Sequence, residues 1–131
     1  MTTMLIVEDD PAWRALYQME LGSQFKVYEA VDGLQALSLL DRVQPDIILL
    51  DLKLPRMDGL DFLRAMDRKG IRTPVVVCSG MLPEDARALF PGIRLAQKSA
   101  DLRYLLGAIR DTLGTGWQAP RRPAAGPDWL D

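Results

Sequence analysis

Five side chains that can take part in chemistry lie at the ends of apolar runs in this sequence of 131 residues. They are Glu8, Asp9, Asp51, Ser79 and Lys98. If these runs are parallel strands of one open sheet, their carboxyl ends meet at one edge, where such sheets bind ligands. The sequence therefore predicts a cluster of carboxylates that also contains one hydroxyl and one ammonium group.

Such a cluster has a specific chemistry. Carboxylates a few ångströms apart raise one another's pKa unless a cation lies among them. Mg²⁺ suits the position, because it takes one or two carboxylates and keeps waters that a phosphate can replace. One carboxylate can then attack phosphorus to give an aspartyl phosphate, while Lys98 and Ser79 pair with the phosphoryl oxygens. The residues alone predict a phosphoryl-acceptor site that needs no histidine.

The composition excludes several other sites. The sequence has no histidine, which rules out Ser-His-Asp and Cys-His catalysis and histidine-ligated metals. Cys78 is the only cysteine, so an internal disulfide cannot form, and a reducing compartment is expected. Sixteen basic residues against eighteen acidic ones lack the excess typical of nucleic-acid binding. With no membrane-length apolar run and no signal peptide, we expect a cytoplasmic protein without direct nucleic-acid or membrane binding.

Apolar runs alternate with helical patterns along the chain. Strands are predicted at residues 4–7, 25–28, 47–50, 75–78 and 93–96. Helices are predicted at 11–21, 34–43, around 60–66, 84–90 and 102–109. The continuous runs are typical of strands buried on both faces, whereas 25–28 alternates and suits an edge. This order predicts an α/β fold, with helices on both faces of a parallel sheet.

Residues 114–131 differ from the rest. They contain three of the ten glycines and three of the nine prolines and show no apolar periodicity. We therefore predict a folded domain over 1–113, followed by a flexible tail or linker stub over 114–131. The pattern assigns no role to Trp117 and Trp129, which lie in this tail.

Four segments resemble the receiver domain of two-component response regulators. They are MLIVEDD at 4–10, DLKLPRMDG at 51–59, VCSG at 77–80 and QKS at 97–99. The resemblance extends from about residue 3 to residue 113. It implies a flavodoxin-like (βα)5 three-layer sandwich, with a parallel five-stranded sheet in the order 2-1-3-4-5.

The resemblance also implies roles for the site. Asp51 would accept a phosphoryl group from a histidine kinase or phosphotransfer protein, and Ser79 and Lys98 would contact the phosphoryl oxygens. The groups that would hold Mg²⁺ are Glu8, Asp9, Asp51 and the main-chain carbonyl of Lys53. An output domain, a partner protein or a second copy would bind the face formed by the fourth helix, fifth strand and fifth helix. The domain would catalyse only its own phosphorylation and dephosphorylation.

Two positions depart from the family pattern. Receivers often carry an aromatic residue three positions before the lysine, where this sequence has Leu95. A proline usually follows the lysine, where this sequence has Ser99. Lys98–Ser99 and the short predicted fourth helix are similar to receivers that precede LuxR-type DNA-binding domains, so transcription regulation is one expectation.

Other functions stay open at this level. A receiver-like module that binds a partner without phosphorylation is favoured by Leu95 and disfavoured by the complete polar set. An aspartate-nucleophile phosphatase of the dehalogenase-like class has a second aspartate two residues after the first, where this sequence has Lys53. A nucleotide- or flavin-binding module needs a glycine-rich loop after the first strand, where this sequence has the acidic segment 8–10 followed by Pro11.

Overall fold

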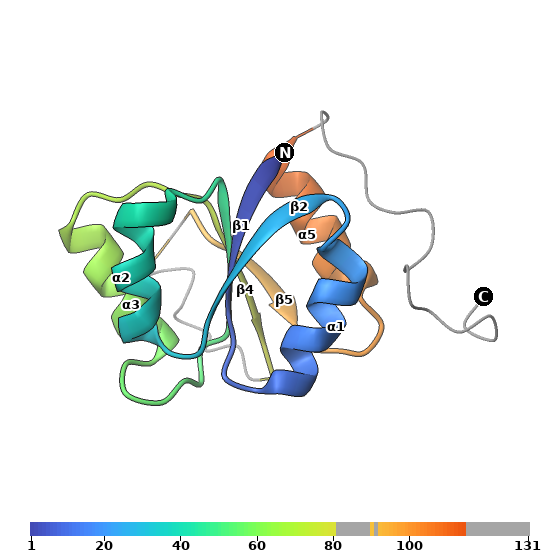
Figure 1. The fold of residues 1–131 in the computed structure, drawn as a ribbon, viewed down its shortest axis with the longest axis horizontal. Helices are drawn as coiled ribbons and strands as arrows, with labels where there is room; N and C mark the ends of the chain where they lie inside the picture. Colours follow the sequence, from blue (N-terminus) through green and yellow to red (C-terminus); the bar gives the residue numbers. More distant parts are fainter. Residues whose placement is uncertain (81–89, 91, 115–131) are drawn as a thin grey trace.

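The fold is an alternation of strands and helices along the chain (Figure 1). The computed structural model describes residues 1–80, 90 and 92–114. The elements of this part are β1 (Thr2–Val7), α1 (Pro11–Leu21), β2 (Phe25–Ala30), α2 (Gly33–Val43), β3 (Ile47–Leu50), α3 (Gly59–Arg68), β4 (Val75–Ser79), β5 (Arg94–Gln97) and α5 (Arg103–Leu113). None of the helices described is long and apolar enough to cross a membrane.

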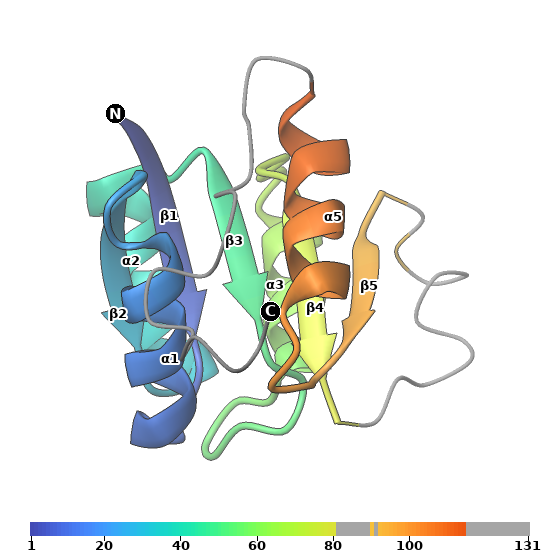
Figure 2. The same cartoon turned by 90° about the vertical axis from the view of Figure 1, so that its right-hand side faces the viewer.

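The five strands form one parallel sheet in the order β2-β1-β3-β4-β5. Figure 2 shows the strand arrows pointing the same way, so their carboxyl ends share one edge. Val7 pairs with Leu50, and Leu50 pairs with Val77, which brings the residues that follow these strands to the same level. The predicted sheet order is confirmed, and β2 is an edge strand as predicted.

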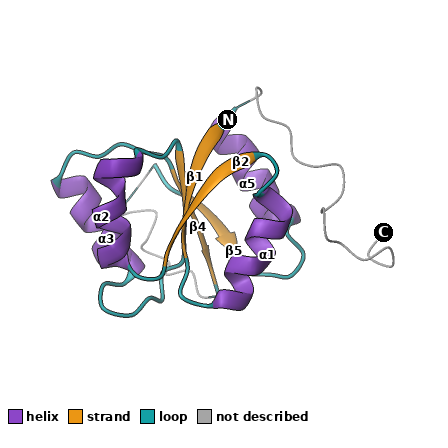
Figure 3. Cartoon of the chain, viewed as in Figure 1, coloured by secondary structure: helices purple, strands orange, loops and turns teal. Residues whose placement is uncertain are grey.

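Helices cover both faces of the sheet, and each face has its own apolar core (Figures 1 and 3). Leu5 and Val7 of β1 pack on the side of α2 and α3, while Met4 and Ile6 pack on the side of α1 and α5. Successive residues of a strand point to opposite faces, and both faces are buried here. This explains why β1 and β3 are continuous apolar runs.

Aspartates begin three of the helices. Asp10, Asp32 and Asp58 each accept a hydrogen bond at a side-chain oxygen from a main-chain N–H of the first turn, at 2.8 Å in every case. Such an N-cap satisfies one of the unpaired N–H groups at the helix start. The predicted start of α1 after Asp10 and its end before Gly22 are confirmed.

Some predicted details differ from the structure. The spacing of the apolar residues in 34–43 places Leu34 on one helix face with Leu37 and Leu40, but Leu34 is 51% exposed in the structure. The buried residues of that helix are Gly33, Ala36 and Leu40, which puts Leu34 on the solvent side. Ile93 is buried but precedes β5, which begins one residue later. The predicted helix at 84–90, apart from Phe90, and the tail at 115–131 lie outside the described residues.

Gly59, the first residue of α3, lies against the main chain that follows β3. Its N–H donates to the carbonyl oxygen of Leu52 at 2.8 Å. A Cβ at Gly59 would lie 2.5 Å from the Asp51 carbonyl oxygen and 2.6 Å from the Leu52 Cα, both backbone atoms. The Asp-Gly pair at the end of the DLKLPRMDG segment therefore lets α3 begin close to Asp51.

We expect Gly59→Ala to lower the free energy of unfolding by about 1–3 kcal/mol, because the backbone must move to admit the methyl group. Gly107→Ala is the matched control, since the nearest atom to a Cβ there is the flexible Arg110 side chain at 4.0 Å. Gly107 lies inside α5, so this change should raise stability by about 0.5–1 kcal/mol. Urea unfolding followed by circular dichroism measures both, and effects of equal sign would contradict the close packing at Gly59.

Candidate functional site

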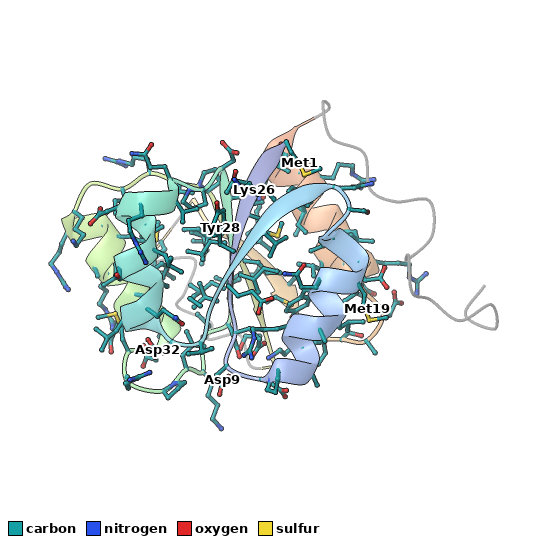
Figure 4. All side chains as sticks on the ribbon, in the orientation of Figure 1. Met1, Asp9, Met19, Lys26, Tyr28 and Asp32 are labelled. Carbon is teal, nitrogen blue, oxygen red and sulfur yellow. The ribbon has the colours of Figure 1, made fainter. Side chains whose placement is uncertain are left out.

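The carboxyl edge of the sheet holds a cluster of acidic side chains. Glu8 follows β1 and Asp51 follows β3, and their exposed fractions are only 1% and 7%. Asp9 follows Glu8 and is exposed. Figure 4 shows Asp9 and Asp32 at the same end of the molecule, where β1 and β2 end. The predicted convergence of the strand ends is therefore present.

The three carboxylates can share one cation. One oxygen from each of Glu8, Asp9 and Asp51 lies within 4.8 Å of those of the other two. All three donors are carboxylate oxygens, which hard cations such as Mg²⁺ prefer over softer metals. The residues present therefore fit Mg²⁺; two of the three carboxylates are buried and the third, that of Asp9, is exposed.

Lys98 places an ammonium group among these carboxylates. Its Nζ forms ion pairs with Glu8 Oε1 and, at 3.0 Å, with Asp51 Oδ2. Burial lowers the pKa of Lys98, but hydrogen bonds to Glu8 and Asp51 outweigh burial and raise it overall. Burial raises the pKa of Glu8, and the bond to Lys98 opposes this rise. Lys98 thus stays charged and compensates two buried acids.

Main-chain contacts hold this arrangement. The second oxygen of Glu8 accepts a hydrogen bond from the Asp10 N–H at 3.0 Å. The Lys98 N–H donates to the carbonyl of Ser79 at 2.8 Å, which joins the ends of β4 and β5. Ser79 itself is buried, with an exposed fraction of 3%. Lys98 and Ser79 are therefore brought to the acidic edge together.

Trp13, at the start of α1, also contacts the site. The Lys98 Nζ lies 5.0 Å from the centre of its ring, within range of a cation–π attraction. Trp13 lies in the first turn of α1, two residues after Pro11. The spacing along the chain carries no signal for this contact, because it joins residues 85 positions apart. The Trp13 ring lies 5.9 Å from the ring of Tyr17, whose hydroxyl donates to the buried Cys78 sulfur at 3.5 Å.

The other residues singled out from the sequence lie around this cluster. The Lys53 N–H lies 3.4 Å from Asp51 Oδ1, and its side chain is exposed. Leu95 is half-buried in β5 and packs on the core beneath α2 and α3. Cys78 lies in the apolar core, as expected for a structural thiol.

The loop after Asp51 is attached to the start of α2. The Gly33 N–H donates to the Met57 carbonyl at 3.0 Å, and Arg56 pairs with the buried Asp32 at 2.5 Å. The hydrogen bond from the Gln35 N–H and the nearby Arg56 guanidinium lower the pKa of Asp32. Arg56 has a positive φ of 64°, which is unusual for a residue with a side chain. The sequence analysis did not predict this ion pair. Asp32-Gly33 matches a helix start and Arg56 lies in a loop pattern, but neither pattern indicates that the two side chains meet.

The sheet order and the acidic edge with its lysine are those of a receiver, the class that the sequence resembles. The chain belongs to the response regulator receiver domain family, whose model matches residues 4–94. Its function is that of a receiver in two-component signalling. Receivers of this family interact with histidine kinases and with output domains, and bind Mg²⁺ in an acidic pocket.

Three known proteins illustrate the similarity. A protein-glutamate methylesterase/protein-glutamine glutaminase of Treponema denticola is 36% identical over 95 residues, which are 70% of this chain and 26% of that protein. The BeF3-activated receiver domain of RstA from Klebsiella pneumoniae has a TM-score of 0.76 at 26% identity and covers 87% of this chain and 100% of its own. TrrA of Thermotoga maritima, solved with Mg²⁺-BeF, has a TM-score of 0.77 at 20% identity, covering 86% and 99%. The chain spans about a quarter of the length of the curated relatives it matches.

We expect Lys98→Met to lower the free energy of unfolding at pH 7 by about 3 kcal/mol, because Glu8 and Asp51 then lack their cation. Burial already raises the pKa of Glu8, so the folded variant takes up a proton at Glu8 more readily than the unfolded chain does. The loss should therefore shrink as the pH falls from 7 towards 5.

Urea unfolding at several pH values measures this effect. Lys69→Met, at an exposed position at the end of α3, is the control and should change stability little at any pH. A loss in Lys98→Met that stays constant from pH 7 to pH 5 would contradict the compensation of Glu8.

Proposed function

We propose that Asp51 is the phosphoacceptor of this receiver and that Mg²⁺ assists the transfer. The observation that carries the proposal is the position of Asp51, buried within 4.8 Å of two further carboxylates and 3.0 Å from an ammonium group. The proposed ligands of the ion are Glu8, Asp9, Asp51 and the main-chain carbonyl of Lys53. The donor is a histidine kinase or phosphotransfer protein.

The chemistry is a transfer of a phosphoryl group to a carboxylate. An oxygen of Asp51 forms a bond to phosphorus while the bond between phosphorus and the donor breaks, and the donor keeps that electron pair. Bound Mg²⁺ supplies positive charge to the phosphoryl oxygens. Lys98 pairs with one of these oxygens in place of its bond to Asp51 Oδ2, and the Ser79 hydroxyl donates to another. Burial of Asp51 holds the attacking oxygen in place.

The competing functions fit less well. A dehalogenase-like phosphatase needs an acid two residues after its nucleophile, and Lys53 is exposed and cannot donate as a carboxylic acid does. Burial of two carboxylates beside a lysine carries a desolvation penalty. A module that works without phosphorylation gains nothing from this arrangement, whereas a phosphoacceptor site requires these groups. The domain is thus proposed to catalyse only its own phosphorylation and dephosphorylation.

The output is proposed to act through the face that contains β5 and α5. Arg94 of β5 and the exposed Tyr104 of α5 line a shallow hollow of about 340 Å³ on this face. An output domain, a partner protein or a second copy of the chain can dock there. We propose residues 1–113 as the receiver and 114–131 as a tail or linker. The methylesterase activity named for the Treponema relative is one possible output, and transcription regulation is another.

We expect Mg²⁺ to change the fluorescence of Trp13 until the site is saturated, because the ring lies against Lys98 at the edge of the cluster. The titration uses a Trp117→Phe/Trp129→Phe chain, so that Trp13 is the only indole. Asp9→Asn should weaken Mg²⁺ binding at least ~10-fold through loss of a ligand. Asp67→Asn removes the same charge from the exposed face of α3 and should bind as the parent does. Equal affinities for all three chains would refute the assignment of Asp9.

We expect acetyl phosphate with Mg²⁺ to add one phosphoryl group to the parent chain and none to Asp51→Asn, as measured by intact mass. A small donor suffices, because the receiver supplies the groups that orient the phosphoryl oxygens. Asp58→Asn is the control, because asparagine also caps a helix and that site lies outside the proposed ligands. If folded parent chain is never labelled, the phosphorylation-independent reading replaces the proposal.

A further inference from the structure

Arg14, in the first two turns of α1, reaches back to the loop that carries both acidic ligands. Its Nη1 donates to the main-chain carbonyl of Glu8 at 2.9 Å and to that of Asp9 at 3.0 Å. These are the two residues of the acidic pair, and Arg14 contacts their backbone rather than their carboxylates. One guanidinium nitrogen therefore ties together the two peptide units that carry the side chains of the proposed metal site.

The guanidinium is itself held in place from β2. Arg14 Nε pairs with Glu29 Oε2 at 3.0 Å, and the other oxygen of Glu29 accepts from Gln18 Nε2 at 2.9 Å. Arg14 and Gln18 lie one helical turn apart, so both face the same glutamate. Only 20% of the Arg14 side chain is exposed. The planar guanidinium thus has partners on two of its nitrogens and is not a freely moving surface cation.

The loop between β1 and α1 must keep a fixed conformation if it is to position the proposed metal ligands. It is short, and its main chain is joined to the sheet by the hydrogen bond from the Glu8 N–H to the Ala30 carbonyl, at 3.0 Å. Mg²⁺ requires near-ideal octahedral geometry, so small rotations of the Asp9 peptide unit displace a ligand from its position. Groups that orient metal ligands typically change metal affinity 10–100-fold when they are removed.

We propose that Arg14, held by Glu29, is a positioning residue for the metal site, setting Mg²⁺ affinity through the main chain of Glu8 and Asp9. The proposal rests on the proposed Mg²⁺ site. This role predicts a change in Mg²⁺ affinity opposite to the one that the charge of Arg14 alone predicts. A positive charge close to a cation site weakens binding, so loss of Arg14 by charge alone should strengthen Mg²⁺ binding. Loss of positioning should weaken it.

Calorimetric titration with Mg²⁺ separates the two effects. The variants are Arg14→Gln, which removes the charge, and Arg14→Lys, which keeps it but cannot bridge the same three acceptors. Both should bind Mg²⁺ about 10-fold more weakly than the parent. Arg64→Gln, which removes an exposed arginine paired with Asp61 on α3, should bind within about twofold of the parent.

A double variant tests the part played by Glu29. Arg14→Gln/Glu29→Gln has the net charge of the parent, and Glu29 acts here through Arg14. Its Mg²⁺ affinity should therefore equal that of Arg14→Gln alone. If the double variant instead binds Mg²⁺ about another 10-fold more weakly than Arg14→Gln, Glu29 acts by its own charge, and that part of the inference is overturned.

A destabilised fold must be distinguished from a displaced ligand. Ile48→Val, at the far end of β3 from the acidic edge, costs about 1 kcal/mol of stability and should leave Mg²⁺ affinity unchanged. Parent-like affinity in Arg14→Lys, or tighter binding by Arg14→Gln, overturns the inference and leaves the metal site standing. Absence of Mg²⁺ binding by the parent overturns the metal site itself, and the role of Arg14 with it.

Discussion

Repulsion between carboxylates at one edge of a buried sheet is the constraint on which this structure depends. Parallel strands bring Glu8 and Asp51 to the same level, and the pairing of β1 with β3 leaves them no room to separate. Both are buried, and Asp9 brings a third negative charge within 4.8 Å. The Lys98 ammonium offsets part of this charge in the structure. The remaining negative charge makes the edge attractive to a divalent cation, so the arrangement that is costly for folding is the one that suits ligand binding.

Main-chain bonds rather than side-chain packing keep the loops of this edge in place. Arg14 holds the backbone after β1, the Met57 carbonyl accepts from Gly33 at the start of α2, and Gly59 brings α3 against Leu52. Each loop is thereby tied to a neighbouring helix or strand on which the apolar core is built. The acidic edge can then carry mutually repelling groups without local opening, because the cores on both faces of the sheet hold the helices from which these bonds come.

Local patterns predicted most of the fold and the chemical content of the site. The apolar runs, the N-cap Asp10 and the stop at Gly22 act over a few residues, so the sequence predicted the described elements. Both bounds match for 11–21 and 47–50, and the other elements differ by one to four residues at one or both ends. The pattern put Leu34 on the same face as Leu37 and Leu40, yet Leu34 is exposed, because the spacing of leucines does not indicate where the helix meets the sheet. Contacts between distant segments, such as Lys98 with Trp13 and Arg56 with Asp32, depend on side-chain direction and loop conformation. Spacing along the chain contains no signal for them, and the same holds for Arg14, whose targets are main-chain atoms that every residue possesses.

The reach of Lys98 has a mechanical consequence. β5 is an edge strand, and the side chain that follows it extends past the end of β4 to Asp51 after β3 and Glu8 after β1. The ion pairs of this one side chain thus connect the ends of β5, β3 and β1 across the edge of the sheet. If Asp51 is phosphorylated as proposed, Lys98 would lose its ion pair with Asp51 Oδ2, and the restraint on β5 would change with it. Under the proposed function, this lysine would connect the state of Asp51 to β5 without an aromatic side chain at position 95, where this chain has Leu95.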